Sequence, residues 1–272
     1  MRLDYCCADR PQLGIGLCAG CGLTQAMDFS HVRLDHYKAD DYFPVDWRPV
    51  YEREASWNLK RLALLTALLP HPASRRILDY GCGIGGFVRR ATGRFAAVTG
   101  FDLSPQRVAA LRGDGFSCVN HMEDVPDDVD TLVLFHVLEH VPRPWELLAD
   151  LLTSLPHVDR VVLEVPNESE ALISLFDNAD YRRNHYSADH IWYFTNATLR
   201  VVAEWAGLRV LKDTQMQRYA LGNTFGWLSQ GRGGGQNLWP FFGEPELDEA
   251  YEAALVGAGV ADSVFLVCEP TR

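Results

Sequence analysis

No stretch of this 272-residue sequence is apolar over the ~20 residues that a membrane-spanning helix needs. The first residues, Met-Arg-Leu-Asp-Tyr-Cys-Cys, lack the apolar stretch of a secretory signal peptide. These two absences predict a cytoplasmic protein with no membrane span. In that compartment we expect the seven cysteines to be free thiols or metal ligands, because disulfides are rare there.

The sequence also lacks a surplus of positive charge, internal repeats and low-complexity linkers. Its 25 basic and 36 acidic residues leave a net charge of −11, which argues against general binding of nucleic acid or of anionic membranes. Hydrophobic residues make up 47% of the sequence, which is enough to build a sizeable core. The length suits one large domain with a small appendage.

The most informative stretch is Ile77-Leu-Asp-Tyr-Gly-Cys-Gly-Ile-Gly-Gly86. Residues 77–80 have the pattern of a short buried strand, the glycines follow, and a helical pattern begins at Phe87. A strand, a glycine turn and a helix in this order form the first crossover of a doubly wound α/β sheet, with a ligand at the turn. Asp79 indicates the kind of ligand, since its carboxylate would hold a cationic amino group and repel a pyrophosphate.

The glycines alone leave the ligand open, because Gly81-x-Gly83-x-x-Gly86 also fits the dinucleotide fingerprint. Asp102 ends the next strand, where an acidic residue would bind the ribose hydroxyls of either ligand. A nicotinamide-dependent oxidoreductase is therefore an alternative at this point. A non-catalytic protein of the same fold is another.

Strand patterns alternate with helical patterns along the rest of the chain, which predicts a parallel sheet with helices on both faces. Ligands bind such sheets beyond the carboxyl ends of the strands, so the candidate residues directly follow the strands. The expected strands are 76–80, 95–101, 116–119, 129–135, 158–165, 208–213 and 263–268.

Two longer strings are more specific than the glycines. Leu78-Asp-Tyr-Gly-Cys-Gly-Ile-Gly85, with the later Phe101-Asp-Leu-Ser104, resembles the S-adenosylmethionine (SAM) site of class I SAM-dependent methyltransferases. The string Leu134-Phe-His-Val-Leu-Glu-His-Val141 resembles the segment after the fourth strand of that family. The resemblance implies a Rossmann-like α/β fold with a doubly wound, mostly parallel seven-stranded sheet and a small N-terminal cysteine-containing appendage.

The resemblance also implies a cofactor site for SAM, with S-adenosylhomocysteine (SAH) as the product. In that family the first acidic residue and the glycine loop hold the methionine part, the second acidic residue holds the ribose, and the turn after the third strand meets the adenine. The implied cofactor residues are Asp79, Gly81, Cys82, Gly83, Gly85, Asp102, Leu103, Met122, Glu123, Asp124 and His136.

Residues 1–45 resemble the zinc ribbon and connector that precede the SAM domain, residues 46–272 here, in some bacterial sugar-modifying methyltransferases. The candidate ligands of a structural zinc are Cys6, Cys7, Cys18 and Cys21. Cys-x-x-Cys at 18–21 is a good metal knuckle. The adjacent pair at 6–7 departs from the pattern, so a degenerate ribbon with free thiols is the alternative. In the connector, Tyr42 would cover the cofactor site or be an ordinary packed residue.

Residues 170–194 are aromatic, charged and rich in histidine, which is typical of a substrate lid. The candidate general bases are His190, His185 and His140. The alternative for each is a structural hydrogen bond. The candidate substrate contacts are Tyr42, Asn167, Arg182, Arg183 and Tyr186. The glycine-rich stretch 217–243 has aromatic flanks and would be a substrate-side flap or a homodimer contact.

These features together predict methyl transfer from SAM to a small molecule. The ribbon-like start and the lid resemble enzymes that modify nucleotide-activated sugars or surface-glycan precursors, so we expect a hydroxyl of such a molecule as the acceptor. The runner-up is a natural-product or quinone O-methyltransferase. A non-catalytic SAM-fold protein would bind SAM weakly and tolerate loss of the lid histidines.

Overall fold

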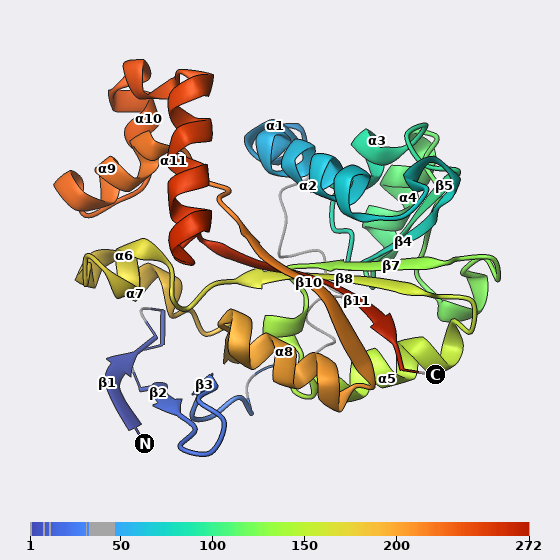
Figure 1. Ribbon diagram of the computed structural model, residues 1–272, viewed down its shortest axis with the longest axis horizontal. Helices are drawn as coiled ribbons and strands as arrows, with labels where there is room; N and C mark the ends of the chain where they lie inside the picture. Colours follow the sequence, from blue (N-terminus) through green and yellow to red (C-terminus); the bar gives the residue numbers. More distant parts are fainter. Residues whose placement is uncertain (1, 8, 11, 31, 33–46, 272) are drawn as a thin grey trace. The chain divides into compact units, whose positions relative to one another are not determined.

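The computed structural model describes residues 2–7, 9–10, 12–30, 32 and 47–271 (Figure 1). The chain forms two compact units. Unit 1 comprises Met1–His31, Val165–Val201 and Asp213–Phe265, and unit 2 comprises Val32–Glu164, Val202–Lys212 and Leu266–Arg272. No described helix combines the length and apolar character needed to cross a membrane.

A seven-stranded sheet has the strand order β10-β11-β8-β7-β4-β5-β6. Its strands are β4 (Arg76–Tyr80), β5 (Ala97–Phe101), β6 (Cys118–Val119), β7 (Thr131–Phe135), β8 (Arg160–Pro166), β10 (Leu208–Met216) and β11 (Ser263–Pro270). The ladders that join β6, β5, β4, β7 and β8 are parallel. From β4 the chain adds β5 and β6 on one side and then β7 and β8 on the other. This reversal of direction at β4 confirms the predicted doubly wound, mostly parallel sheet.

Four strands begin two residues later than their apolar pattern predicted. Phe95, Val129 and Val158 lie just before β5, β7 and β8, and they are buried although they precede the strands. Apolar side chains enter the core before the backbone joins the ladder, so the hydrophobic pattern is longer than the strand. The central strands are buried on both faces, as parallel strands are.

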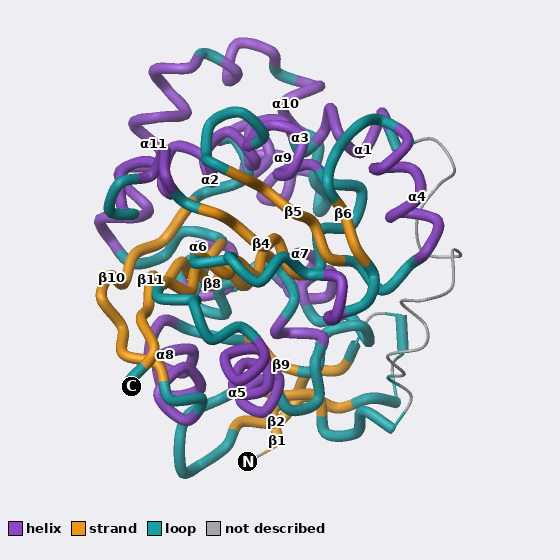
Figure 2. The backbone as a smooth tube through the Cα atoms, turned by 90° about the vertical axis from the view of Figure 1, so that its right-hand side faces the viewer, coloured by secondary structure: helices purple, strands orange, loops and turns teal. Residues whose placement is uncertain are grey.

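Helices of unit 2 cover both faces of its strands (Figures 1 and 2). They are α1 (Arg48–Arg53), α2 (Ala55–Leu68), α3 (Gly86–Ala91), α4 (Pro105–Gly113) and α5 (Pro144–Ser154). In both views α2, α3 and α4 lie on one side of β4, and α5 lies on the other. α1 and α2 are divided at Glu54, whose backbone leaves the helical region.

Unit 1 contains a four-stranded sheet in the order β1-β2-β3-β9. Its strands are β1 (Arg2–Cys6), β2 (Gly14–Leu17), β3 (Thr24–Ala26) and β9 (Trp192–Tyr193). The N-terminal strands therefore pair with the end of the expected lid, with Thr24 opposite Tyr193. A buried cluster joins the same two regions through Cys7, Leu13, Ile15, Ala26, Tyr186, Ala188 and Tyr193.

Helices form much of the expected lid and flap. They are α6 (Ala171–Ser174) and α7 (Ala179–His185) in the lid, and α9 (Leu221–Gln230) and α10 (Gly235–Leu238) in the flap. The helix α11 (Pro245–Ala258) follows the flap, and α8 (Asn196–Trp205) follows β9. Gly235 lets α10 approach α9, since a Cβ there would lie 2.0 Å from the carbonyl oxygen of Gly222.

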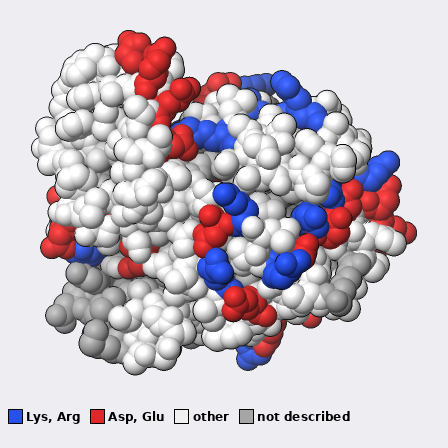
Figure 3. Space-filling model, in the orientation of Figure 1, with Lys and Arg blue, Asp and Glu red and all other residues white. Residues whose placement is uncertain are grey.

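The charged surface agrees with the composition. On the face shown in Figure 3, basic side chains lie beside acidic ones rather than in one continuous basic surface.

Candidate functional site

The glycine turn joins β4 to α3 in unit 2. Gly81, Gly83 and Gly85 have φ of +80°, +56° and +73°, which side-chain-bearing residues rarely adopt. A Cβ at Gly81 would lie 2.6 Å from Val137 Cγ2, and one at Gly85 would lie 2.3 Å from Leu111 Cδ2. Gly83 has nothing within 4 Å of its Cβ position. Neighbouring side chains therefore pack against both ends of the turn, and its middle is open.

Asp102 holds this turn from the end of β5. Its Oδ2 accepts a hydrogen bond from Gly83 N at 2.9 Å, and its Oδ1 accepts one from Ser104 N at 2.9 Å. Burial raises the pKa of Asp102, while Arg107 and these two amides oppose the rise. Leu103 follows, half-buried. The structure thus brings Asp102 against the glycine turn, where ribose hydroxyls would share its remaining lone pairs.

Asp79 lies in β4 and is only 3% exposed. Burial raises its pKa to about 7; Arg61 lowers it, and Asp102 and Glu164 raise it further. None of the described residues donates a hydrogen bond to its carboxylate. A buried carboxyl without a donor is costly unless a ligand supplies one. Asp79 therefore fits the cationic amino group that the sequence predicted for this position.

The other cofactor candidates of unit 2 surround the same strand ends. Met122, Glu123 and Asp124 form a short 3-10 helix after β6, with Met122 half-buried and both acids exposed. Cys82 Sγ lies 3.8 Å from Cys118 Sγ, and this hydrogen bond together with burial raises the pKa of the Cys82 thiol. A Cβ at Gly100 would lie 2.7 Å from Cys82 Sγ. Cys82 therefore fills space beneath the turn.

His136 follows β7 in a left-handed conformation, with φ of +56°. Its Nδ1 lies 3.1 Å from Glu139 Oε1, and its Nε2 lies 2.8 Å from Glu164 Oε1. Both ring nitrogens therefore face carboxylates. His140 Nε2 is 3.9 Å from Glu139 Oε1, so His136 and His140 share the carboxylate of Glu139.

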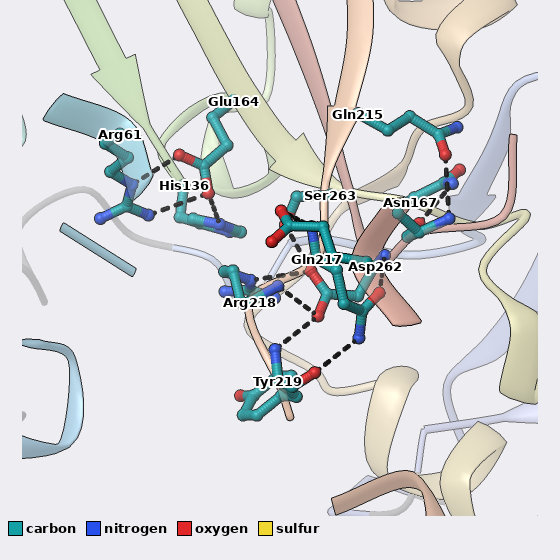
Figure 4. Close-up of polar contacts among 12 residues, drawn as sticks. Arg61, His136, Glu164, Asn167, Gln215, Gln217, Arg218, Tyr219, Asp262 and Ser263 are labelled. Carbon is teal, nitrogen blue, oxygen red and sulfur yellow. Dashed lines mark hydrogen bonds and ion pairs between the residues drawn. The ribbon is translucent and has the colours of Figure 1, made fainter. Parts of the chain in front are cut away.

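Sequence reasoning missed Arg61 and Glu164. Arg61 of α2 donates to both carboxylate oxygens of Glu164, with Nε–Oε2 at 2.5 Å and Nη2–Oε1 at 3.0 Å (Figure 4). Burial disfavours the charge of Glu164, but Arg61 and His136 outweigh it and hold its pKa well below the usual range. The available signals were an arginine on the apolar face of a helix and a glutamate inside an apolar strand.

Two lid candidates, His185 and Tyr186, and the candidate Asn167 just before the lid make contacts within unit 1. His185 Nε2 lies 3.0 Å from Glu168 Oε2, and the Tyr186 hydroxyl donates to the other oxygen of Glu168. Asn167 is fully buried; its Nδ2 donates to Ala261 O at 2.7 Å and its Oδ1 accepts from Ser169 N at 3.0 Å. For His185 these contacts match the alternative stated above, a structural hydrogen bond.

The remaining lid candidates are more accessible. Arg182 pairs with Asp177, and Arg183 pairs with Asp180. His190 is half-buried, and its ring centroid is 6.1 Å from that of Tyr193. Tyr42 lies outside the described residues. Substrate and general-base roles for these residues stay predictions.

The N-terminal cysteines divide into two environments. Cys18 and Cys21 share a turn in which the backbone of Cys21 and Gly20 hydrogen-bonds to the Cys18 sulfur and lowers its thiol pKa. Cys7 lies in the buried cluster of unit 1, and the side chain of Cys6 is outside the description. Among the side chains that are described, the cysteines do not bring three ligand atoms together. The turn suits a metal knuckle, and the zinc stays a prediction.

Comparison with known proteins identifies related sequences. The family model described as "Methyltransferase domain" matches residues 51–213. The ubiquinone biosynthesis O-methyltransferase of Aeromonas salmonicida is 31% identical over 167 residues, which cover 56% of this chain and 70% of that protein. The trans-aconitate 2-methyltransferase of Mycobacterium marinum is 30% identical over 142 residues, covering 50% of this chain and 54% of that protein. The matched stretch thus spans about half of the mycobacterial relative.

Solved structures share the fold. A SAM-dependent methyltransferase from Archaeoglobus fulgidus has a TM-score of 0.51 at 18% identity, over 82% of this chain and all (100%) of that one. A SAM-dependent methyltransferase from Thermotoga maritima has a TM-score of 0.52 at 14% identity, over 83% of this chain and 94% of that one. At these identities the likeness concerns the fold alone.

Proposed function

We propose that this chain, which belongs to the methyltransferase-domain family and is a class I SAM-dependent methyltransferase, transfers the methyl group to a hydroxyl of a small molecule. The observation that supports the SAM site is the position of Asp79 just before the glycine turn. A buried carboxyl without a described donor lies next to a backbone that is open at Gly83. The matched family now disfavours the nicotinamide alternative.

The residues present fit SAM. Asp79 would accept from the cationic amino group, the backbone at 81–85 would lie along the methionine part, and Asp102 would bind the ribose hydroxyls. Met122 would pack on the adenine, and Glu123 or Asp124 would accept from its amine. SAM supplies an activated electrophile at its sulfonium, so the chain mainly holds the acceptor in line and excludes water.

The proposed acceptor residues are those of the expected lid. His190 is the preferred base, because it is half-buried whereas His185 is buried. A histidine that removes the hydroxyl proton as the oxygen attacks would contribute roughly 10²–10⁴-fold to the rate. Arg182 and Arg183 would attract a phosphate or carboxylate on the acceptor.

Two acceptor classes are supported by different observations. Similarity to ubiquinone biosynthesis O-methyltransferases favours a phenolic hydroxyl of a quinone precursor or natural product. The knuckle-like turn at Cys18 and Cys21 favours the sugar-modifying relatives, with a nucleotide-activated sugar as the acceptor. We rank the phenolic class first because the 31% identity to such a relative extends over 167 residues and 70% of that protein.

The first experiment measures SAM and SAH binding by calorimetry, with Asp102→Asn as the test variant. Asp150→Asn is the matched control, because Asp150 is exposed on α5 of the same unit. Loss of binding in the first variant alone would support the site. SAH release is then followed with catechols, nucleotide sugars and aconitate. Turnover of catechols supports the phenolic class, and turnover of nucleotide sugars alone overturns our ranking.

A further inference from the structure

A buried cluster of charged groups lies beside the cofactor turn in unit 2. Arg61, Glu164 and His136 come from α2, β8 and the turn after β7, and Figure 4 shows the Glu164 carboxylate between the other two side chains. The guanidinium of Arg61 also lies over the ring of Phe135, 4.7 Å from its centroid. Glu164 and Glu139 are both fully buried.

His136 links two buried carboxylates. A carboxylate only accepts hydrogen bonds, and the ring of His136 faces Glu139 with Nδ1 and Glu164 with Nε2. Asp79 on β4 and His140 beside Glu139 lie in the surroundings of these groups.

This cluster reaches both ends of the glycine turn. On one side, Val137 follows His136 directly, and its Cγ2 would lie 2.6 Å from a Cβ at Gly81. On the other side, Arg61 Nη1 donates to Asn58 Oδ1 at 3.0 Å, and Asn58 Nδ2 would lie 2.6 Å from a Cβ at Gly86. The turn is therefore held between two residues that the charged cluster orients.

We propose that Arg61, Glu164 and His136 act as positioning residues that hold the ends of the glycine turn, and thereby the cofactor site, in one conformation. None of the three touches the cofactor in this proposal. The expected effect of this cluster on SAM affinity rests on the proposed function. The expected effect on the conformation of the glycine turn does not. Each side chain acts through a neighbour, Val137 or Asn58.

The test compares three variants of the full chain. Glu164→Gln leaves the guanidinium of Arg61 without its counter-charge. Arg61→Met with Glu164→Leu replaces the pair by apolar side chains of similar volume, which often restores stability after loss of a buried ion pair. His136→Asn removes the imidazole ring while tolerating the left-handed backbone. Asp150→Asn is again the exposed control.

Three measurements separate positioning from mere stability. Hydrogen exchange of the amides at 81–86 without cofactor reports on the turn, thermal unfolding reports on stability, and calorimetry reports on SAH affinity. We expect all three variants to exchange at least tenfold faster at 81–86 and to bind SAH at least tenfold more weakly. The apolar double variant should regain stability without regaining slow exchange.

Recovery of slow exchange together with stability in the double variant would overturn the proposal. If the wild type fails to bind SAH, the proposed function fails, and the exchange measurement still decides whether the cluster holds the turn.

Discussion

Replacing Asp79 by asparagine should stabilise the protein without cofactor and destroy its affinity for SAM. The side chain keeps its shape and loses its charge. Burial raises the pKa of Asp79 from the ordinary 3.8 to about 7. That difference corresponds to about 4 kcal/mol, at roughly 1.36 kcal/mol per pH unit.

The sign follows from proton binding. Between pH 4 and 7 the folded protein holds a proton on Asp79 that the unfolded chain has already lost, so folding stability falls as pH rises through this window. Above pH 7 the whole penalty of about 4 kcal/mol is present. The gain from Asp79→Asn should therefore be larger at pH 8 than at pH 5, by roughly 2–3 kcal/mol.

The assay is thermal unfolding at both pH values, with Asp150→Asn as the control for removal of an exposed charge. For a chain of this length we expect Tm to rise by roughly 5–10 °C at pH 8. The same variant should bind SAM at least ~100-fold more weakly, because an amide does not neutralise the ammonium group. Wild-type affinity should weaken up to about tenfold per pH unit below pH 7.

A lower Tm for Asp79→Asn at pH 8 would refute the reasoning about burial, because it would mean that the carboxylate is stabilised by contacts within the folded chain. Unchanged SAM affinity would refute the role of Asp79 in holding the amino group. The two outcomes are independent.

Three further predictions concern the turn, the lid and the N-terminal cysteines. Gly85→Ala should cost about 2–4 kcal/mol, because it combines positive φ with the contact to Leu111, whereas Gly83→Ala should cost only about 1–2 kcal/mol; denaturant unfolding compares them. His190→Ala should lower turnover at least about tenfold with SAM affinity unchanged, while His185→Ala should mainly lower Tm; an unaffected rate would remove His190 from the mechanism. Cys18→Ser with Cys21→Ser should abolish zinc content measured by mass spectrometry of the purified protein, and a metal-free wild type would support the degenerate ribbon instead.

The sheet and the cofactor turn could be predicted because their signals are local. A buried strand is a short apolar run, and a turn with positive φ at three positions needs glycines at those positions. Asp79 could be predicted because it lies near the end of the strand just before the turn. Asp102 could be predicted because it directly follows the next strand. The strand starts were placed too early because burial extends beyond the ladder, as at Phe95 and Val129.

The N-terminal hairpin and the flap show where local reasoning stopped. Pairing of β3 with β9 joins Thr24 to Tyr193, and nothing in either segment specifies the other. The glycine-rich stretch 217–243 was expected to be a flap or a dimer contact from its composition. In the structure, the missing side chain of Gly235 allows two helices to touch.

Sequence patterns alone predicted the doubly wound sheet, the glycine turn and the acidic residues beside it, because these depend on neighbours a few positions apart. The cluster of Arg61, Glu164 and His136 became visible in the folded chain alone. Arg61 and Glu164 are 103 positions apart, and their attraction depends on a shared burial that no local pattern encodes. His136 contacts two carboxylates in the same buried region.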